Sequence, residues 1–91
     1  MKVVINRCYG GFGLSESAFN RYNEITGGNA KYHWDIERND PALVQVVEEL
    51  GDEANSKFSE LVIIEIPKDI SWMVIEDDGM EHIAESHRIW Y

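Results

Sequence analysis

Near its start the chain passes from an apolar run through a glycine-rich loop to a helix start, in residues 3–15, VVINRCYGGFGLS. The β-branched run at residues 3–5 predicts a short buried strand. The glycines that follow interrupt regular structure. Ser15 then predicts a helix N-cap, with Leu14 and Phe19 at the two positions of a hydrophobic staple. A strand–loop–helix unit is therefore expected to open the fold.

A second helix is indicated further along the chain. Apolar residues at helical spacing after Ser15 predict the first helix, and Gly27 with the glycine after it is expected to end that helix. Asp40 followed by Pro41 is typical of a helix cap and its first position, and Gly51 is the expected stop. The alternating residues 32–36 suggest an extended segment or an edge strand between the two helices.

The second half of the sequence predicts strands. Residues 61–66 form an apolar run ended by Pro67 and are expected to be the central strand. Residues 71–76 and 80–85, joined through 77–79, indicate a hairpin. The order β-α-α-β-β-β predicts a single α+β domain over residues 1–91, with a small mixed β-sheet and two helices packed on one face.

Composition excludes several classes of protein. The chain has 91 residues, 8 Lys and Arg against 17 Asp and Glu, and a net charge of −9, which disfavours general DNA or RNA binding. A hydrophobic content of 44% excludes a disordered chain. One cysteine excludes an internal disulfide framework and a cysteine-rich zinc site. No apolar run is long enough to span a membrane or to act as a signal peptide, so we expect a cytoplasmic protein.

The glycine-rich loop is the first candidate for a binding site. Glycines let backbone approach a ligand closely, and a helix start presents free N–H groups to an anion. Arginines add charged forks for a phosphate or carboxylate, and aromatic rings stack on a base. The expected ligand-binding residues are Arg7, Tyr9, Gly10, Gly11, Phe12, Ser15, Arg38 and Arg88. The alternative is a tight turn whose aromatics close the core, with each arginine paired to a surface acid.

Other chemistry receives weaker support. Cys8 beside Arg7 is the only candidate nucleophile, with His82 or His87 as its base, but a lone cysteine after a strand is typical of a small buried apolar residue. We therefore expect no catalysis and no cofactor. The histidine spacing does not predict a metal site, although His33 with Asp35 and Glu81 with Glu85 would share strand faces.

Two surface features point to partners. Glu76, Asp77, Asp78 and Glu81 predict a solvated, acidic hairpin tip that discourages edge pairing. Three tryptophans and four tyrosines exceed what one small core encloses. Aromatic surface favours interfaces, so a homo-oligomer is expected.

The motif at residues 6–15, NRCYGGFGLS, resembles the opening of a family of small, acidic, largely uncharacterised proteins of tailed bacteriophages and prophages. The likeness covers nearly the whole chain through weaker motifs at residues 38–44, 47–51, 65–67, 78–79, 83–85 and 87–88. Asp77 stands where the family has an aromatic residue, which removes a stacking role there. The resemblance implies a viral accessory protein in the host bacterial cytosol.

Two functions follow as hypotheses. The first is an anti-defence protein that binds and sequesters a small anionic, nucleotide-like signalling molecule at a subunit interface. The second is an acidic inhibitor that contacts a host defence complex, in the manner of an anti-CRISPR protein or a nucleic-acid mimic. An enzyme is the third and least supported reading, because no catalytic constellation has recognisable spacing.

Overall fold

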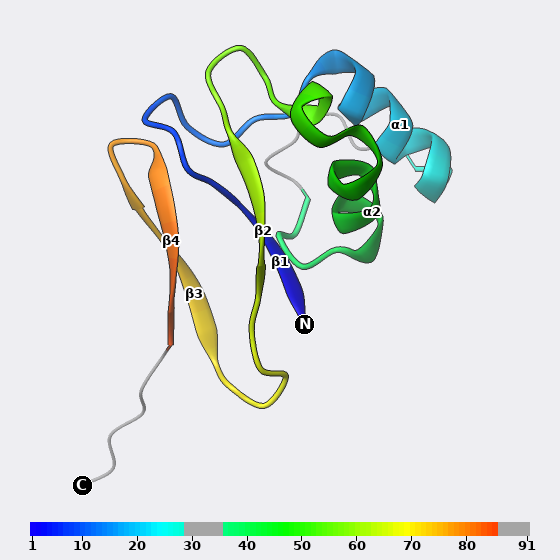
Figure 1. Ribbon diagram of the computed structural model, residues 1–91. Helices are drawn as coiled ribbons and strands as arrows, with labels where there is room; N and C mark the ends of the chain where they lie inside the picture. The colour runs from blue at the N-terminus through cyan, green and yellow to red at the C-terminus, as the bar shows by residue number, and fades with distance from the viewer. Residues whose placement is uncertain (29–35, 86–91) are drawn as a thin grey trace, which may run out of the picture.

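The computed structural model describes residues 1–28 and 36–85, and its elements follow the expected order β-α-α-β-β-β, which confirms the α+β class (Figure 1). The elements are β1 (Lys2–Asn6), α1 (Glu16–Thr26), α2 (Pro41–Leu50), a 3₁₀ turn η2 (Gly51–Ala54), β2 (Leu61–Glu65), β3 (Trp72–Asp77) and β4 (Met80–Glu85). Most of the expected extended segment at residues 32–36 lies outside the described residues.

Both helices begin where the sequence places their caps. The Ser15 hydroxyl accepts a hydrogen bond from the N–H of Ala18 at 3.1 Å, which satisfies one free donor of α1. One carboxylate oxygen of Asp40 accepts from the N–H of Ala42 at 2.8 Å, at the start of α2. The other accepts from the Tyr22 hydroxyl at 2.6 Å, so the cap of α2 also fastens α1 to it.

The strands form two antiparallel pairs, β1 with β2 and β3 with β4, instead of the one mixed sheet that we expected. In the first pair Val4 lies opposite Ile63. The reason for the separation is that β1 is buried on both faces, with Val3, Val4 and Ile5 at most 1% exposed. A strand apolar on both sides needs a layer over each face.

The two apolar faces of the β1–β2 pair are covered by different layers. Val4 and Leu61 belong to a core shared with the helices, which includes Leu43 of α2. Val3 and Ile5 belong to a second core to which the β3–β4 hairpin contributes partly buried side chains. Figure 1 shows the helices on one side of β1 and β2 and the hairpin on the other. The fold is therefore a three-layer stack, with β1 at its centre.

Candidate functional site

The glycine-rich loop follows β1 and lies between two other turns. A Cβ atom at Gly10 would come within 2.0 Å of the Phe58 carbonyl oxygen, so the loop touches the connection between η2 and β2. A Cβ atom at Gly79 would come within 2.3 Å of the Tyr9 carbonyl oxygen, so the loop also touches the β3–β4 turn. Gly11 has φ +94°, which favours glycine. Close backbone approach therefore accounts for Gly10 and Gly79, and the positive φ accounts for Gly11.

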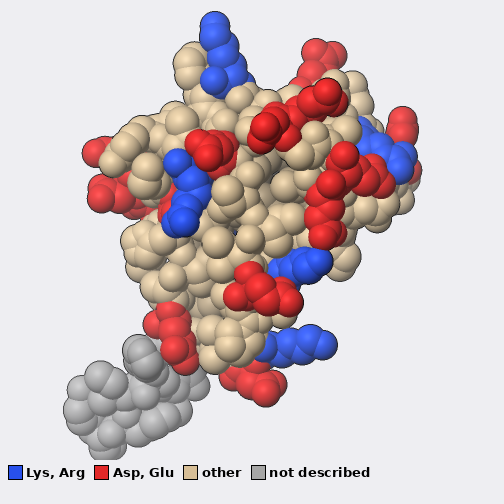
Figure 2. All heavy atoms as spheres, viewed as in Figure 1, with Lys and Arg blue, Asp and Glu red and all other residues tan. Residues whose placement is uncertain are grey.

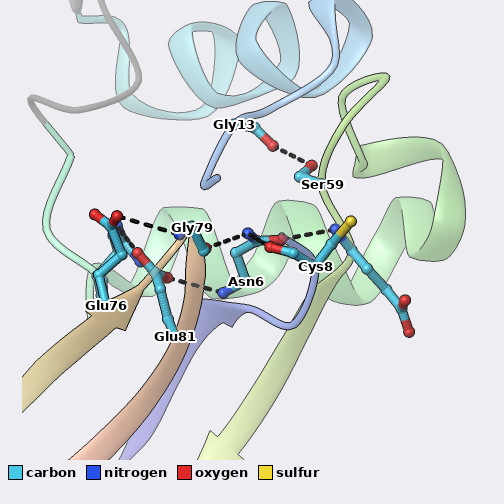
Figure 3. A network of polar contacts seen from close by, with 9 residues as sticks. Asn6, Cys8, Gly13, Ser59, Glu76, Gly79 and Glu81 are labelled. Carbon is cyan, nitrogen blue, oxygen red and sulfur yellow. Dashed lines mark hydrogen bonds and ion pairs between the residues drawn. The ribbon is translucent and has the colours of Figure 1, made fainter. Parts of the chain in front are cut away.

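A buried amide ties these three turns together (Figure 3). The Asn6 side-chain nitrogen donates to the carbonyl oxygens of Cys8 at 2.6 Å and Gly79 at 2.8 Å. Its side-chain oxygen accepts from the N–H of Glu60 at 2.8 Å. Since the Asn6 side chain has no exposed surface, its donor and acceptor need partners within the protein, because an unpaired buried polar group is costly. Asn6 thus sets the shape of the loop.

An ion pair between a buried carboxylate and a partly exposed arginine completes the network. Glu81 is 4% exposed, so the expectation that it belongs to a solvated hairpin tip is wrong. Its carboxylate accepts from both terminal nitrogens of Arg38, at 2.5 and 2.8 Å, and from the N–H of Asn6 at 2.9 Å. The Arg38 guanidinium also lies 3.6 Å from the ring centre of Phe12. The packing of β4 against β1 buries the carboxylate. The N–H of Asn6 at the edge of β1 and the Arg38 guanidinium compensate for its burial, because both donate hydrogen bonds to it.

Two aromatic side chains stand out from this network into solvent. Tyr9 is 70% exposed and Phe58 is 63% exposed, although both belong to segments that the polar network holds. Lys57 lies with its ammonium 5.6 Å from the Phe58 ring centre, and Arg7 is exposed at the start of the loop. We call Arg7, Tyr9, Lys57 and Phe58 the ring surface.

The surroundings of the ring surface are acidic. Figure 2 shows acidic side chains spread over one face of the molecule, with basic side chains occurring singly among them. Glu60 is exposed after Phe58, and Asp77 and Asp78 are exposed at the hairpin turn that touches the loop. Arg7 and Lys57 are therefore cations within an acidic chain, and they are expected to act on an anion only at short range.

The structure gives four roles to the expected binding residues that it describes. Gly10 and Gly11 shape the loop, and Arg38 lies against the Phe12 ring while its guanidinium donates to Glu81. Ser15 acts as a cap, and its hydroxyl also donates to the carbonyl oxygen of Glu53 at 2.7 Å. Arg7 and Tyr9 remain at the surface. Arg88 lies outside the described residues, so its place in the binding site stays a prediction.

Among residues 1–28 and 36–85, the other candidate chemistry finds no assembled site. Cys8 is half-buried, and no hydrogen bond joins it to His82, which lies opposite Ile75 in the hairpin. No group of three or more His, Cys, Asp or Glu side chains that could hold a metal ion occurs in this part of the chain. No helix in the same residues is long and apolar enough to cross a membrane. His33, Asp35 and His87 lie outside the described residues.

Several residues of this region were not found from the sequence. Phe58 lies in a short polar connection, where an isolated aromatic between Lys57 and Ser59 was the available signal. For Asn6 the available signal was a polar amide side chain directly after an apolar strand. The Ser59 hydroxyl donates to the carbonyl oxygen of Gly13 at 2.7 Å, a contact across 46 positions that no local pattern indicates.

Comparisons of this chain with protein-family models, with curated proteins and with solved structures found no match.

Proposed function

We propose that this chain is a non-catalytic binding protein, which takes a small anionic, nucleotide-like molecule on the ring surface. The observation that carries the proposal is the exposure of Tyr9 and Phe58, at 70% and 63%, on backbone that a buried polar network holds in place. Large rings on well-held backbone lose little conformational freedom when they bind, and they suit flat partners.

Two kinds of contact would contribute to binding: aromatic stacking on a base and cationic contacts to an anionic group. A nucleobase has an apolar face that stacks on an aromatic side chain, and stacking contributes about 1–3 kcal/mol per base. Lys57 lies beside the Phe58 ring, and Arg7 is exposed two residues before Tyr9, so both are expected to contact phosphate or carboxylate groups. Arg38 has a different role, because Glu81 holds its guanidinium against the ring of Phe12 in the glycine-rich loop.

The ring surface projects from one protomer, and a second copy facing it would enclose the ligand. Small-molecule sites usually bury most of the ligand surface, which exposed rings on a single copy do not do. We therefore propose a homo-oligomer in which the ligand lies between copies. In the setting that the family resemblance implies, the protein sequesters a host immune nucleotide in the bacterial cytosol and so blocks defence.

Isothermal titration calorimetry against cyclic and ADP-ribose-derived nucleotides tests this function. We expect heat from at least one of them, and we expect Tyr9→Ala and Phe58→Ala each to weaken binding roughly tenfold, which corresponds to about 1.4 kcal/mol. Met73→Ala is the matched control, because Met73 is also exposed, at 49%, but lies on β3. No heat from any member of the panel, or binding that both ring variants leave unchanged, would refute the proposal.

A second candidate function is inhibition of a host defence complex by protein contact. Two adjoining features favour it: Met73 and Ile75 are exposed apolar residues on β3, and Asp77 and Asp78 are exposed beside them. Phage infection of hosts that carry defence systems separates the two candidates. The measured quantity is the ability of the phage to infect a host whose defence system is active. If the Asp77→Lys/Asp78→Asn variant loses this ability and the Arg7→Ala variant keeps it, protein contact is favoured over ligand binding.

A further inference from the structure

A groove of about 570 Å³ opens at the start of β1, well away from the ring surface. It is lined by Met1, Lys2, Asn39, Pro41, Val44 and Lys68. These residues come from three segments: the start of β1, the entry to α2 and the connection between β2 and β3. Along an extended strand the five steps from Lys2 to Arg7 cover about 17 Å, so the groove and the ring surface are separate sites.

The lining combines apolar surface with hydrogen-bond donors. Val44, Pro41 and Met1 supply the apolar part. The polar side chains among the lining residues are those of Lys2, Lys68 and Asn39; an ammonium group only donates hydrogen bonds, and an amide both donates and accepts. The Asn39 nitrogen contacts the sulfur of Met1 at 3.7 Å, and a thioether is a weak acceptor that an oxygen would readily replace.

The two lysines differ in their partners. Lys2 donates to Glu48 at 2.9 Å, and this hydrogen bond, more than the attraction of Glu48 and Glu65, raises the pKa of Lys2 above its usual value. Lys68 is exposed, and the described residues offer it no ion pair. Lys2 and Lys68 are two of only 8 Lys and Arg residues in a chain of net charge −9, and because Lys2 is paired with Glu48, Lys68 is the cation of the two that is available to an anion.

We propose that this groove binds a small apolar carboxylate, such as a medium-chain fatty acid. The carboxylate lies between the Lys68 ammonium and the Asn39 amide, and the hydrocarbon chain lies along Val44 and Pro41. The volume falls within the range of about 300–1,000 Å³ that is typical of ligand sites, and donors around apolar surface are complementary to this class of molecule. Lys2 also lines the groove, but its ammonium is already paired with Glu48.

Titration of the whole protein with octanoate, followed by amide chemical shifts, tests the site. We expect saturable shifts at residues 39–44 and 68, and weaker or no shifts with octanol, which has the same hydrocarbon chain without the charge. Lys68→Met keeps the apolar stem and removes the ammonium, so it is expected to weaken octanoate binding about tenfold, the usual scale of a lost charge-assisted hydrogen bond. Lys57→Met is the matched control, because Lys57 belongs to the ring surface.

The outcomes separate this proposal from the proposed function. Lys68 is exposed, so the variant is expected to keep the melting temperature of the parent protein, which shows that it folds. Equal losses in Lys68→Met and Lys57→Met, equal binding of octanoate and octanol, or shifts away from the groove would each overturn the carboxylate site. Tyr9→Ala is expected to leave octanoate binding unchanged, so failure at one site does not carry over to the other.

Discussion

Replacement of Glu81 by glutamine or alanine is expected to destabilise the fold in two separable steps. The carboxylate of Glu81 joins three segments: β4, the edge of β1 through the N–H of Asn6, and the entry to α2 through Arg38. Glutamine removes the charge but keeps an oxygen for Asn6. Alanine removes both and also the side-chain carbons, so the difference between the two variants reports the unpaired N–H together with the lost packing.

The magnitudes follow from burial. Loss of one partner from a fully buried ion pair costs about 3–5 kcal/mol, and the Arg38 side chain is 22% exposed, so Glu81→Gln is expected to cost about 2 kcal/mol. Alanine additionally leaves the N–H of Asn6 without its acceptor, which adds about 1–3 kcal/mol. For a domain of this size, 2 kcal/mol lowers the melting temperature by about 8–16 °C.

Thermal and urea denaturation followed by circular dichroism measure these changes. Glu24→Gln is the matched control, because Glu24 contacts Arg21 at 2.9 Å on the surface, and its replacement is expected to leave the melting temperature unchanged. Arg38→Met combined with Glu81→Gln is expected to be less destabilised than the sum of the single changes, because neither charge is then left alone. Equal effects of Glu81→Gln and Glu24→Gln, or of the two Glu81 variants, would refute this account.

Three further predictions concern single residues. Burial, followed by the hydrogen bond to Asp40, raises the pKa of Tyr22 to about 12, so the folded state favours the neutral phenol. The stabilisation from this group is expected to be fully present below pH 10 and to be lost as the pH rises from 10 toward 12. Tyr22→Phe should remove this pH-dependent loss of unfolding free energy in denaturation curves. Gly79→Ala forces a side chain into φ +91° and within 2.3 Å of the Tyr9 carbonyl oxygen, so urea denaturation should show a larger loss than for Gly27→Ala, where φ is +61° and no atom lies within 4 Å. Ser15→Ala removes the cap of α1 and is expected to cost about 1 kcal/mol in the same assay, and calorimetry should find nucleotide binding unchanged if the hydroxyl is only structural.

Local patterns predicted the elements well because their causes are local. A cap such as Asp40 bonds to an N–H two residues later, and a turn such as 77–79 depends on neighbouring backbone. The caps, the hairpin and the order of elements could therefore be read from short stretches. The layering could not, because it depends on which element covers each face of β1.

The candidate site divides in the same way. The glycine-rich loop with Tyr9 and Phe12 was recognisable as a sequence motif. The contacts that shape the loop join positions far apart in the sequence, such as Asn6 with Gly79 and Arg38 with Glu81. Glu81 looked like one more acid of a solvated turn. Its burial follows from the packing of the hairpin against β1, which the spacing of charges does not report.

The sequence by itself thus determined the α+β class, the helix limits and a loop suited to close backbone contact, because hydrophobic period, capping and glycine act within a few residues. Only the tertiary structure decided that Arg38 supports the loop through Glu81, while Tyr9 and Phe58 stay in solvent. The physical reason is that the partner of a buried charge can come from any part of the chain, because burial without a partner is costly. The exposure of a ring likewise depends on how distant segments pack around it.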